Sequence, residues 1–360
     1  MKNGSTPLVS IITVCFNSEQ TIEQTIKSVL GQTYKNVEYI IVDGQSTDGT
    51  LGIVNKYKSQ IAKVVSEPDD GLYYAMNKGI SMATGDIVGI INSDDWYEPY
   101  TVEEVVACFH ETNAELVYGD MLVIEDKGTK LMTTDNLEDL RVNMVVPHST
   151  VFIQKEVYAL YGVFDVRYKI AADYDLMIRL YNMGIKFVRV KKVLAYFRMG
   201  GASTLAEELT VTEVAQIARK YCKGTPEERA YLLERIDNIS KGYYFEKKLK
   251  YNSLQIASNI SLILQENGME EVGIFGCGTW GTTVGRILSD IGIAVSYYVD
   301  NAPEKWGKVI NGVKVIEPQS LHKASGLVLI LVNGYSKEIL SQIEQMNNSN
   351  VKSISWESLL

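Results

Sequence analysis

The stretch that decides the fold is residues 87–96, IVGIINSDDW, in which an apolar run ends in two adjacent carboxylates. Short β-branched runs bounded by turn residues are typical of buried strands. Carboxylates at the carboxyl end of such a strand lie where open α/β sheets bind ligands. Two neighbouring acids repel each other unless a cation or hydroxyl groups meet them, and hard oxygen ligands suit Mg²⁺ or Mn²⁺. The alternative is an ordinary surface turn, because Asp is common in turns.

Two more strand-type runs precede this one, at residues 9–16 and 37–42, and each ends in polar residues. Segments with helical spacing of apolar residues separate the runs, at residues 21–30, 50–57 and 71–82. This alternation predicts an α/β fold with a mostly parallel sheet flanked by helices. The strand ends of such a sheet converge on one edge. We therefore expect four acids to share one crevice: Asp43, Asp48, Asp94 and Asp95.

The chain carries four motifs in a fixed order. They are VSIITVCFNSEQTIEQTIKSVLGQTYKNVEYIIVDGQSTDGT (9–50), DDGLYYAMNKGISMATGDIVGIINSDD (69–95), PHSTVFIQKEVYALYGVFDVRYKIAADYDLMIRL (147–180) and AYFRMGGAST (195–204). In this order they resemble a family 2 glycosyltransferase with the GT-A fold, over more than half of the chain. The resemblance implies a nucleotide-diphospho-sugar donor, a divalent cation (Mn²⁺ or Mg²⁺) and inversion at the anomeric carbon.

The same resemblance implies residues that bind the nucleoside. Asn17 and Glu19 match the first donor loop, and Asp43 matches the acid that hydrogen-bonds the base. A carboxylate suits the imide N–H of uracil or thymine, so a UDP or dTDP donor is favoured.

Five further residues match the part of the family that holds the sugar diphosphate. Asp70 and Gly71 match the second donor loop, and Asn77 the helix turn that supports it. Asp94 matches the acid near the ribose and metal, and Asp95 the metal ligand. The cation would neutralise the diphosphate and stabilise the departing nucleoside diphosphate.

Asp173 matches the family's catalytic base, which takes the proton from the acceptor hydroxyl. Asp175 is the competitor, but it lies where a helix is expected to begin, and acids there often serve as caps or dipole partners. We therefore assign Asp175 mainly to structure. His148 matches a position beside the acceptor, with the capping of a loop carbonyl as the alternative.

Some positions depart from the family pattern. Gly44, Asn92 and Ala172 stand where many members carry acids. The late histidine that often completes the metal shell has no counterpart near residues 195–204, so Tyr196 or a water is expected there. Arg198 with the glycines at 200–201 could close on the diphosphate or form an ordinary turn.

Composition narrows the functional class. The net charge of −9 leaves no basic excess for nucleic acid. The four cysteines lack metal-ligand spacing, which is typical of reduced thiols in a cytoplasmic protein. No run reaches the ~18 apolar residues of a membrane span, which argues against a membrane-embedded synthase. We expect a cytoplasmic protein, with the inner face of the cell membrane as the place where it meets a lipid-linked acceptor.

The chain changes character after residue 205. Helices are expected at residues 207–222, 226–238 and 243–265, with a helix-start signal at Thr225, Pro226 and Glu228. The Lys- and Tyr-rich residues 241–251 are compatible with peripheral membrane contact, but a solvated helix packing its rings on a neighbouring domain is favoured.

A second α/β unit is predicted after residue 268. A Gly-x-Gly-x-x-Gly turn at 276–281 follows a strand and opens a helix, and Asp300 follows ~20 residues later, as in the dinucleotide fingerprint. An NAD-binding oxidoreductase or sensor is therefore the alternative function. The remaining chain is about half of a full two-mononucleotide fold. We favour a structural, regulatory or homo-oligomerising role for it.

These features predict three domains. They are a GT-A glycosyltransferase domain (1–205), a helical linker or subdomain (206–268) and a Rossmann-like C-terminal domain (269–360). The predicted enzyme is a metal-dependent hexosyl- or N-acetylhexosaminyltransferase. It would transfer sugar to a hydroxyl of a glycan or lipid-linked oligosaccharide in surface polysaccharide synthesis.

Overall fold

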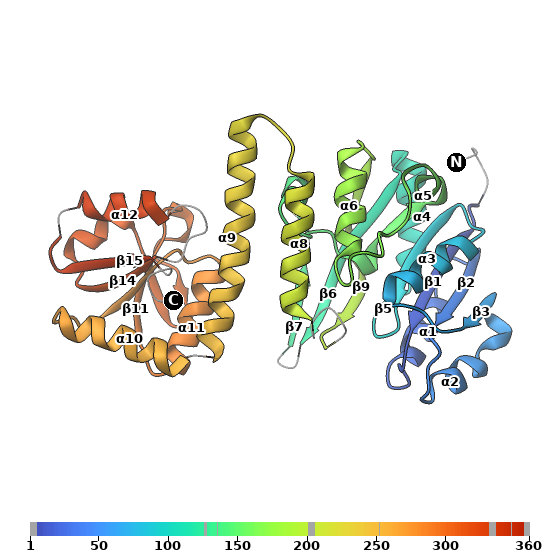
Figure 1. Cartoon of the computed structure of the whole chain (residues 1–360), viewed down its shortest axis with the longest axis horizontal. Helices are drawn as coiled ribbons and strands as arrows, with labels where there is room; N and C mark the ends of the chain where they lie inside the picture. Colours follow the sequence, from blue (N-terminus) through green and yellow to red (C-terminus); the bar gives the residue numbers. More distant parts are fainter. Residues whose placement is uncertain are drawn as a thin grey trace. The chain divides into compact units, whose positions relative to one another are not determined.

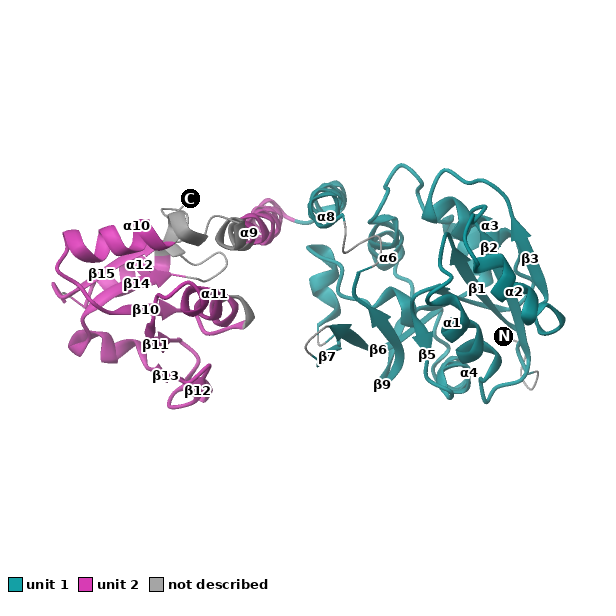
Figure 2. Ribbon diagram, turned by 90° about the horizontal axis from the view of Figure 1, so that it is seen from below, with its two compact units in different colours: residues 1–224 teal, residues 225–360 magenta. Residues whose placement is uncertain are grey.

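The computed structural model describes residues 6–125, 128–134, 136–200, 206–251, 253–330, 336–346 and 348–355. The chain divides into two compact units, residues 1–224 and 225–360, which Figure 2 distinguishes by colour. Among the described residues, none of the helices combines the length and the apolar character that a membrane crossing requires.

The first unit is built from alternating strands and helices (Figure 1). Its strands are β1 (Val9–Cys15), β2 (Val37–Asp43), β3 (Lys63–Ser66), β4 (Ile87–Asn92), β5 (Trp96–Tyr97), β6 (Leu116–Glu125), β7 (Gly128–Met132), β8 (Phe152–Gln154) and β9 (Phe187–Arg198). Its helices are α1 (Ile22–Leu30), α2 (Thr50–Lys56), α3 (Leu72–Met82), α4 (Thr101–Thr112), α5 (Lys155–Tyr161), α6 (Ala172–Asn182) and α8 (Glu207–Tyr221), with short 3₁₀ turns η1 (Lys58–Gln60), η2 (Leu137–Arg141) and η3 (His148–Thr150).

The strands of this unit form one sheet in the order β3-β2-β1-β4-β8-β6-β9-β5, and β7 pairs with the outer part of β6. Strands β3, β2, β1 and β4 are parallel, whereas β8 runs antiparallel to β4 and β6. Cys15 pairs with Asp43, and Val14 pairs with Asn92, so the polar strand ends meet at one edge. The predicted mostly parallel sheet flanked by helices is confirmed.

Both faces of the parallel half are buried because helices cover them. Alternate residues such as Ile11, Ile41 and Ile91 belong to a core cluster that includes residues of α1, α2 and α4. Helix α3 packs on β1 and β2, and Figure 2 shows it on the opposite side of the sheet from α1 and α4. A Cβ on Gly79 of α3 would meet Cγ2 of Ile12 at 2.4 Å, so this glycine permits the close approach of helix and strand.

The second unit consists of two helices followed by a smaller α/β layer. Its helices are α9 (Pro226–Tyr251), α10 (Ser253–Glu266), α11 (Thr279–Asp290) and α12 (Ser336–Glu344), with 3₁₀ turns η4 (Pro303–Lys305) and η5 (Pro318–Lys323). Its strands are β10 (Val272–Phe275), β11 (Val295–Val299), β12 (Val309–Ile310), β13 (Val313–Ile316), β14 (Gly326–Ile330) and β15 (Val351–Ser355). The sheet order is β12-β13-β11-β10-β14-β15, with only the β12–β13 pair antiparallel among the described strands.

The helices before this layer differ from the sequence prediction in one respect. The predicted break between residues 238 and 243 is wrong, because α9 continues through it to Tyr251. Ser240 lies inside the helix and donates its hydroxyl to the carbonyl of Ile236, a bond that keeps the helical path. The predicted helix start is confirmed, since Thr225 and Glu228 exchange the two hydrogen bonds of a capping box.

Candidate active site

One cavity of about 970 Å³ opens in the first unit. Its wall comes from the carboxyl ends of β1 and β4, the start of α3, the turn η3, the start of α6 and the end of β9. Among the predicted site residues, the wall includes Asn17, Gly71, Asp94, His148 and Asp173. The parallel strand ends therefore form a ligand-sized site where open α/β sheets are expected to have one.

The first loop of the wall is tied to the loop after β2. Asn17 adopts a left-handed conformation (φ +48°), and its side-chain oxygen accepts the Thr47 N–H at 2.9 Å. Glu19 is exposed and accepts the Gly49 N–H at 2.7 Å, so it acts as a brace beside the wall. Phe16 lines the cavity with 61% of its surface exposed, a feature that sequence reasoning did not single out.

Asp43 is fully buried, and the wall beside it is formed by Gly44. Its carboxylate accepts hydrogen bonds from the backbone N–H of Ser46 (3.0 Å) and from the hydroxyls of Ser46 (2.5 Å) and Ser66 (2.6 Å). These bonds fix the loop after β2. Asp43 therefore supports the cavity wall from beneath, because it holds the loop that contains Gly44 without lining the described cavity itself.

Asp69 is the acid that the wall presents on this side. It accepts the backbone N–H of Gly71 at 2.9 Å, and Gly71 has φ +132°, which favours glycine. Asp70 is exposed and is not among the described residues of the wall. Sequence reasoning chose Asp70 and missed Asp69, although an Asp two residues before a helix-opening glycine is typical of an Asx turn.

Gly44 explains one departure from the family pattern. A Cβ at this position would lie 2.9 Å from the Oδ2 atom of Asp69. A second acid after Asp43 would therefore require the Asp69 side chain to move, and its charge would repel that of Asp69. The glycine leaves Asp69 room to reach the cavity.

Asn77 lies inside α3 and exchanges two hydrogen bonds with the backbone of Phe164, at 2.9 and 3.0 Å. It thereby holds the chain after α5 against the helix that opens at Gly71. The structure places Asn77 as a support for the wall.

Asp94 and Asp95 lie in different environments. Asp94 is half-buried and lines the cavity, whereas Asp95 is fully buried and accepts hydrogen bonds from the Ser149 hydroxyl (2.6 Å) and the Arg198 N–H (3.1 Å). Burial raises the pKa of Asp95 to about 8, and the neighbouring Asp94 adds to the rise. Burial also raises the pKa of Asp94. A raised pKa means that the negative charge on these two carboxylates is costly, and a cation bound beside them would offset that cost.

The side-chain oxygens at the end of β4 fit a divalent cation that binds together with the phosphates of a substrate. Asn92 lines the cavity, and its Oδ1 atom is buried and has no hydrogen-bond partner within the described part of the chain. Asp94 supplies a second hard oxygen. No group of three His, Cys, Asp or Glu side chains that could hold a metal occurs among the described residues. Mg²⁺-type sites often combine one or two protein oxygens with substrate phosphates and water.

Arg198 is held at the edge of the cavity by stacking. Its guanidinium lies 5.1 Å from the centroid of the Trp96 ring, and Trp96 stacks on Tyr196 at 4.9 Å. One terminal nitrogen donates to Gln24 at 2.8 Å. The Tyr196 hydroxyl donates to Glu98, so it is engaged away from the predicted metal shell. The expected partner glycine at 201 lies outside the described residues.

Asp173 stands in the first turn of α6, half-buried on the cavity wall. Its Oδ1 atom accepts the Tyr174 N–H at 2.8 Å and the Tyr73 hydroxyl at 3.1 Å. The Tyr73 hydroxyl also lies 2.6 Å from the Ile170 carbonyl. Burial raises the pKa of Tyr73 well above its usual range, with the nearby Asp173 charge as a further cause. Tyr73 therefore stays protonated, and its single hydroxyl proton is shared between the Ile170 carbonyl and Asp173, which links Asp173 to the chain just before α6.

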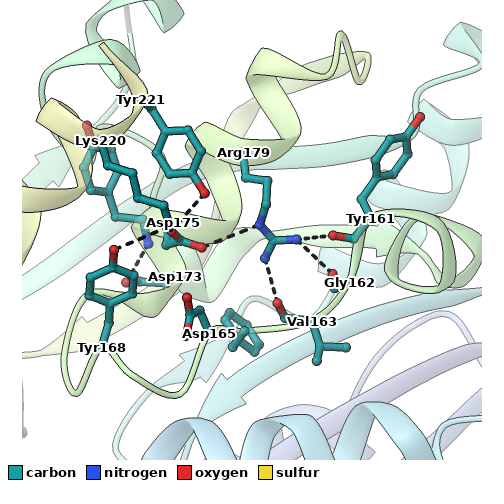
Figure 3. Close-up of polar contacts among 12 residues, drawn as sticks. Tyr161, Gly162, Val163, Asp165, Tyr168, Asp173, Asp175, Arg179, Lys220 and Tyr221 are labelled. Carbon is teal, nitrogen blue, oxygen red and sulfur yellow. Dashed lines mark hydrogen bonds and ion pairs between the residues drawn. The ribbon is translucent and has the colours of Figure 1, made fainter.

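Asp175, two residues on, belongs to a structural network (Figure 3). It is fully buried, and its Oδ1 atom meets the Lys220 ammonium at 2.8 Å and the Tyr221 hydroxyl at 3.1 Å. Arg179 lies 3.5 Å from its other oxygen and also donates to the Val163 carbonyl at 2.7 Å. These contacts confirm the structural interpretation of Asp175, because they join α6 to α8 and to the chain after α5.

Glu213 of α8 is a residue that sequence reasoning missed. It is buried and accepts three consecutive backbone N–H groups, from Lys169 (2.9 Å), Ile170 (3.0 Å) and Ala171 (3.0 Å). These groups lead directly into the helix that carries Asp173. Glu213 is 44 residues away from Lys169 in the sequence, and no pattern around either residue predicts that they bond.

His148 opens η3 and lines the cavity, half-buried. Its ring packs edge-on against Phe164, with centroids 5.7 Å apart. Burial lowers the pKa of His148, and the Asp173 charge opposes this shift. The imidazole is thus predominantly neutral at pH 7 and can accept or donate one hydrogen bond.

The glycine-rich turn of the second unit shows a different arrangement. Asp300, the acid expected to bind a ribose, accepts the Cys277 N–H at 3.0 Å, the Ala302 N–H at 2.9 Å and the Lys305 ammonium at 2.9 Å. The Asp300 carboxylate therefore bonds to the glycine-rich turn at Cys277 and to residues just after β11, and these bonds use the oxygens that would otherwise meet a ribose.

Comparison with solved structures defines the class of protein. The structure of S. aureus TarS 1-349 in complex with UDP-GlcNAc matches with a TM-score of 0.53 at 17% identity, over 79% of this chain and 80% of that chain. The mannosyltransferase PcManGT from Pyrobaculum calidifontis, in complex with GDP-Man and Mn²⁺, matches with a TM-score of 0.52 at 20% identity, over 66% and 72%. The fold is that of the GT-A glycosyltransferases.

Sequence comparison places the chain within that class. The family model Glycosyl transferase family 2 matches residues 10–165, and a second model, C2185-like, N-terminal, matches residues 268–354. An uncharacterized glycosyltransferase of Mycobacterium tuberculosis is 32% identical over 213 residues, which cover 58% of this chain and 81% of that relative. The chain belongs to glycosyltransferase family 2, and it is a glycosyltransferase.

Proposed function

We propose that the protein is an inverting glycosyltransferase that moves a hexosyl or N-acetylhexosaminyl group from a nucleotide-diphospho-sugar to a hydroxyl of a glycan or lipid-linked oligosaccharide in surface polysaccharide synthesis. The observation that carries the proposal is one cavity lined both by the donor-loop residues with Asp94 and by Asp173. Asp94, assigned to the donor diphosphate and its cation, and Asp173, assigned to the acceptor hydroxyl, then line the same cavity.

Asp173 is the base in this proposal. Its Oδ1 atom is held by Tyr73 and Tyr174, which leaves Oδ2 to meet an acceptor hydroxyl. As that proton moves to Asp173, the acceptor oxygen bonds to C1 of the sugar. The bond between C1 and the diphosphate oxygen breaks on the opposite face, and its electron pair leaves with the nucleoside diphosphate. His148 lines the same space and is assigned to the acceptor side.

Asp94 and Asn92 are proposed to hold the divalent cation, Mn²⁺ or Mg²⁺, which would offset the charge on the leaving diphosphate. Asp95 was predicted as a direct ligand. Its full burial and its hydrogen bonds to Ser149 and Arg198 support a role in positioning Asp94, and each of its oxygens keeps a lone pair with which it could also bind the cation. The Mn²⁺ bound to the similarly folded mannosyltransferase is consistent with this assignment.

A uracil or thymine base remains the favoured donor base. Asp69 presents a carboxylate to the cavity and can accept the imide N–H, while Asp43 fixes the loop behind it. Phe16 offers an exposed ring on which a base can stack. The UDP-GlcNAc complex of the similarly folded TarS supports a uridine donor, and the GDP-Man complex shows that the fold also takes guanosine donors.

Residues 269–360, the α/β part of the second unit, are proposed to be a Rossmann-like domain that follows a GT-A domain (1–205) and a helical linker (206–268). Helix α8, at the start of that linker, belongs to the first compact unit. The strand order β13-β11-β10-β14-β15 and the glycine turn before α11 support this. An NAD site is disfavoured because Asp300 is paired with Lys305. We propose a structural or homo-oligomerising role. None of the four cysteines, all of which lie in the described part of the chain, forms a disulfide, which supports a reducing, cytoplasmic location.

Thermal unfolding with UDP, dTDP, GDP and NAD⁺, each with and without Mn²⁺, tests the donor site. A ligand at 100 times its Kd adds about 2.7 kcal/mol of stability. We expect one pyrimidine diphosphate to stabilise the protein only with Mn²⁺, and Asp94→Asn to lose that stabilisation. Stabilisation by NAD⁺ alone would contradict the assignment and favour the second unit as the ligand site.

Asp173→Asn tests the base with the sugar nucleotide identified in this way. The variant should bind the donor with Mn²⁺ as the wild type does, because the amide keeps the side-chain shape. Its transfer rate should fall by about 10²–10⁴-fold, the usual contribution of a general base. Transfer near the wild-type rate with unchanged donor binding would refute the role of Asp173.

A further inference from the structure

The cavity is chemically divided. The wall residues between positions 14 and 94 include the polar groups assigned to the donor, whereas those between 121 and 200 are mostly apolar. The apolar part of that second wall consists of Met121, Met132, Met144, Val146, Pro147, Ile170, Phe197 and Met199. Its described polar side chains are His148, Ser149, Asp173 and Arg198. The side of the cavity that carries Asp173 is therefore mostly apolar.

Four of these apolar residues are methionines, Met121, Met132, Met144 and Met199, and we call them the methionine wall. Met121 and Met132 are direct partners across β6 and β7, so their side chains are neighbours on one face. Phe197 packs on the same core cluster as these two. Met199 is 43% exposed, so the apolar surface continues toward solvent.

Methionine walls suit apolar partners of irregular shape, because the side chain is flexible, polarizable and without hydrogen-bonding capacity of note. A purely polar acceptor would leave hydroxyls unpaired against such a wall, at a cost for each. An apolar group next to the reacting hydroxyl would instead gain from every buried methylene. The wall thus favours acceptors in which an apolar group is joined to the sugar over acceptors that are polar throughout.

We propose that the acceptor is an amphiphile, a hydroxyl-bearing sugar joined to a hydrocarbon group that lies on the methionine wall. The inference rests on the proposed function and narrows it, since it selects a lipid-linked acceptor over a free glycan. The sugar hydroxyl meets Asp173, and the hydrocarbon leaves the cavity past Met199.

The test is a binding measurement that needs no turnover, so it is independent of the transfer assay on Asp173→Asn. The full chain is labelled with ¹³C at the methionine methyl groups and titrated with n-octyl β-D-glucoside below its critical micelle concentration, or with methyl β-D-glucoside. We expect the octyl glycoside to bind at least about tenfold more tightly and to shift the Met132 and Met144 signals.

Met132 and Met144 are half-buried, so their exchange for Gln is compatible with folding, which the unchanged spectrum of the other methionines verifies. Met132→Gln with Met144→Gln should abolish the preference for the octyl glycoside. Met183→Gln is the matched control, a 59% exposed methionine at the end of α6 and outside the described wall. It should leave the preference intact.

Equal binding of the two glycosides would overturn the proposal, as would shifts confined to Met183 or a preference that survives the double substitution. In those cases the wall is covered by the protein itself or meets only the carbon face of a sugar. Loss of transfer in Asp173→Asn alongside such a result would leave the proposed function standing and remove only the lipid-linked acceptor.

Discussion

At the scale of single residues, the cavity wall depends on side chains that are not part of its described lining. Glu213 accepts three backbone N–H groups ahead of α6, and Asp43 accepts bonds from Ser46 and Ser66. Each carboxylate fixes a loop whose other residues line the cavity. The positions of Asp173 and Asp69 thus depend on Glu213 and Asp43, which lie outside the described cavity wall.

Glu213→Gln is expected to lower kcat while leaving donor affinity unchanged. The amide has one acceptor oxygen and two N–H groups, so it cannot serve three N–H donors, and a buried unpaired group costs about 1–3 kcal/mol. That cost corresponds to a fall in Tm of several degrees for a unit of this size. Steady-state kinetics and thermal unfolding measure both effects.

Glu111→Gln, at an exposed position of α4, is the control and should change neither quantity. A Glu213→Gln variant that lost stability but kept the wild-type kcat would show that Glu213 serves folding alone and does not position the base.

The acids proposed for the metal and the base were predictable because they lie in the family motifs. Asp94 follows β4, Asp173 lies in the first turn of α6, and both line the cavity. Asp69 and Glu213 were not predictable from periodicity. The choice between Asp69 and Asp70 depends on the turn at Gly71, and the role of Glu213 depends on a contact between helices far apart in the chain.

At the scale of secondary structure, Glu38 joins elements that sequence order keeps apart. From β2 it accepts the Ser10 hydroxyl of β1 (2.5 Å), the Lys63 ammonium of β3 (2.9 Å) and the Thr84 N–H just after α3 (2.7 Å). Burial alone would raise the pKa of Glu38, but these bonds outweigh it and lower the pKa to about 2.

This lowered pKa makes part of the stability dependent on pH. Because the folded pKa lies below the unfolded value of 4.5, the contribution is complete above pH 4.5 and is lost as the pH falls toward 2. Glu38→Gln should therefore be less stable than the wild type at pH 7, and the gap should narrow between pH 4.5 and 3. Urea unfolding at several pH values measures it. A gap of constant size across that range would contradict the assignment.

Most elements were predictable because their apolar periodicity is strong. The runs at 9–16, 37–42 and 87–91 became β1, β2 and β4 with shifts of a residue or two. The break expected near residue 240 failed because Gly and Ser there weaken a helix without ending it when the flanking turns are good helix formers. The pairing of β8 with β4 is a long-range contact that no local pattern encodes.

At the scale of the whole molecule, the boundary of the catalytic unit decides which truncations keep activity. The first compact unit ends at Gly224 and includes α8, which supplies Glu213, Lys220 and Tyr221 to the neighbourhood of Asp173. The family model ends at residue 165, well before this helix. Helix α8 therefore supports the helix that carries Asp173, although it lies beyond the family model.

A chain of residues 1–224 should keep the donor-dependent rise in Tm, whereas a chain of residues 1–205 should lose it together with transfer. The shorter chain leaves Asp175 as a buried charge without its Lys220 partner, which is strongly destabilising. Thermal unfolding with and without the donor nucleotide and Mn²⁺ compares the two. Equal behaviour of both truncations would show that α8 is dispensable.

The reversal of strand direction between β4 and β8 has a consequence for how such enzymes diversify. Every described wall residue before it comes from positions 14–94, and every one after it from positions 121–200. On the proposed assignment, the two substrates are read by two consecutive segments of the gene. A single recombination event between them would join a new acceptor side to an old donor side, provided that the contacts of Tyr73 with Asp173 and of Asp95 with Ser149 are kept across the junction.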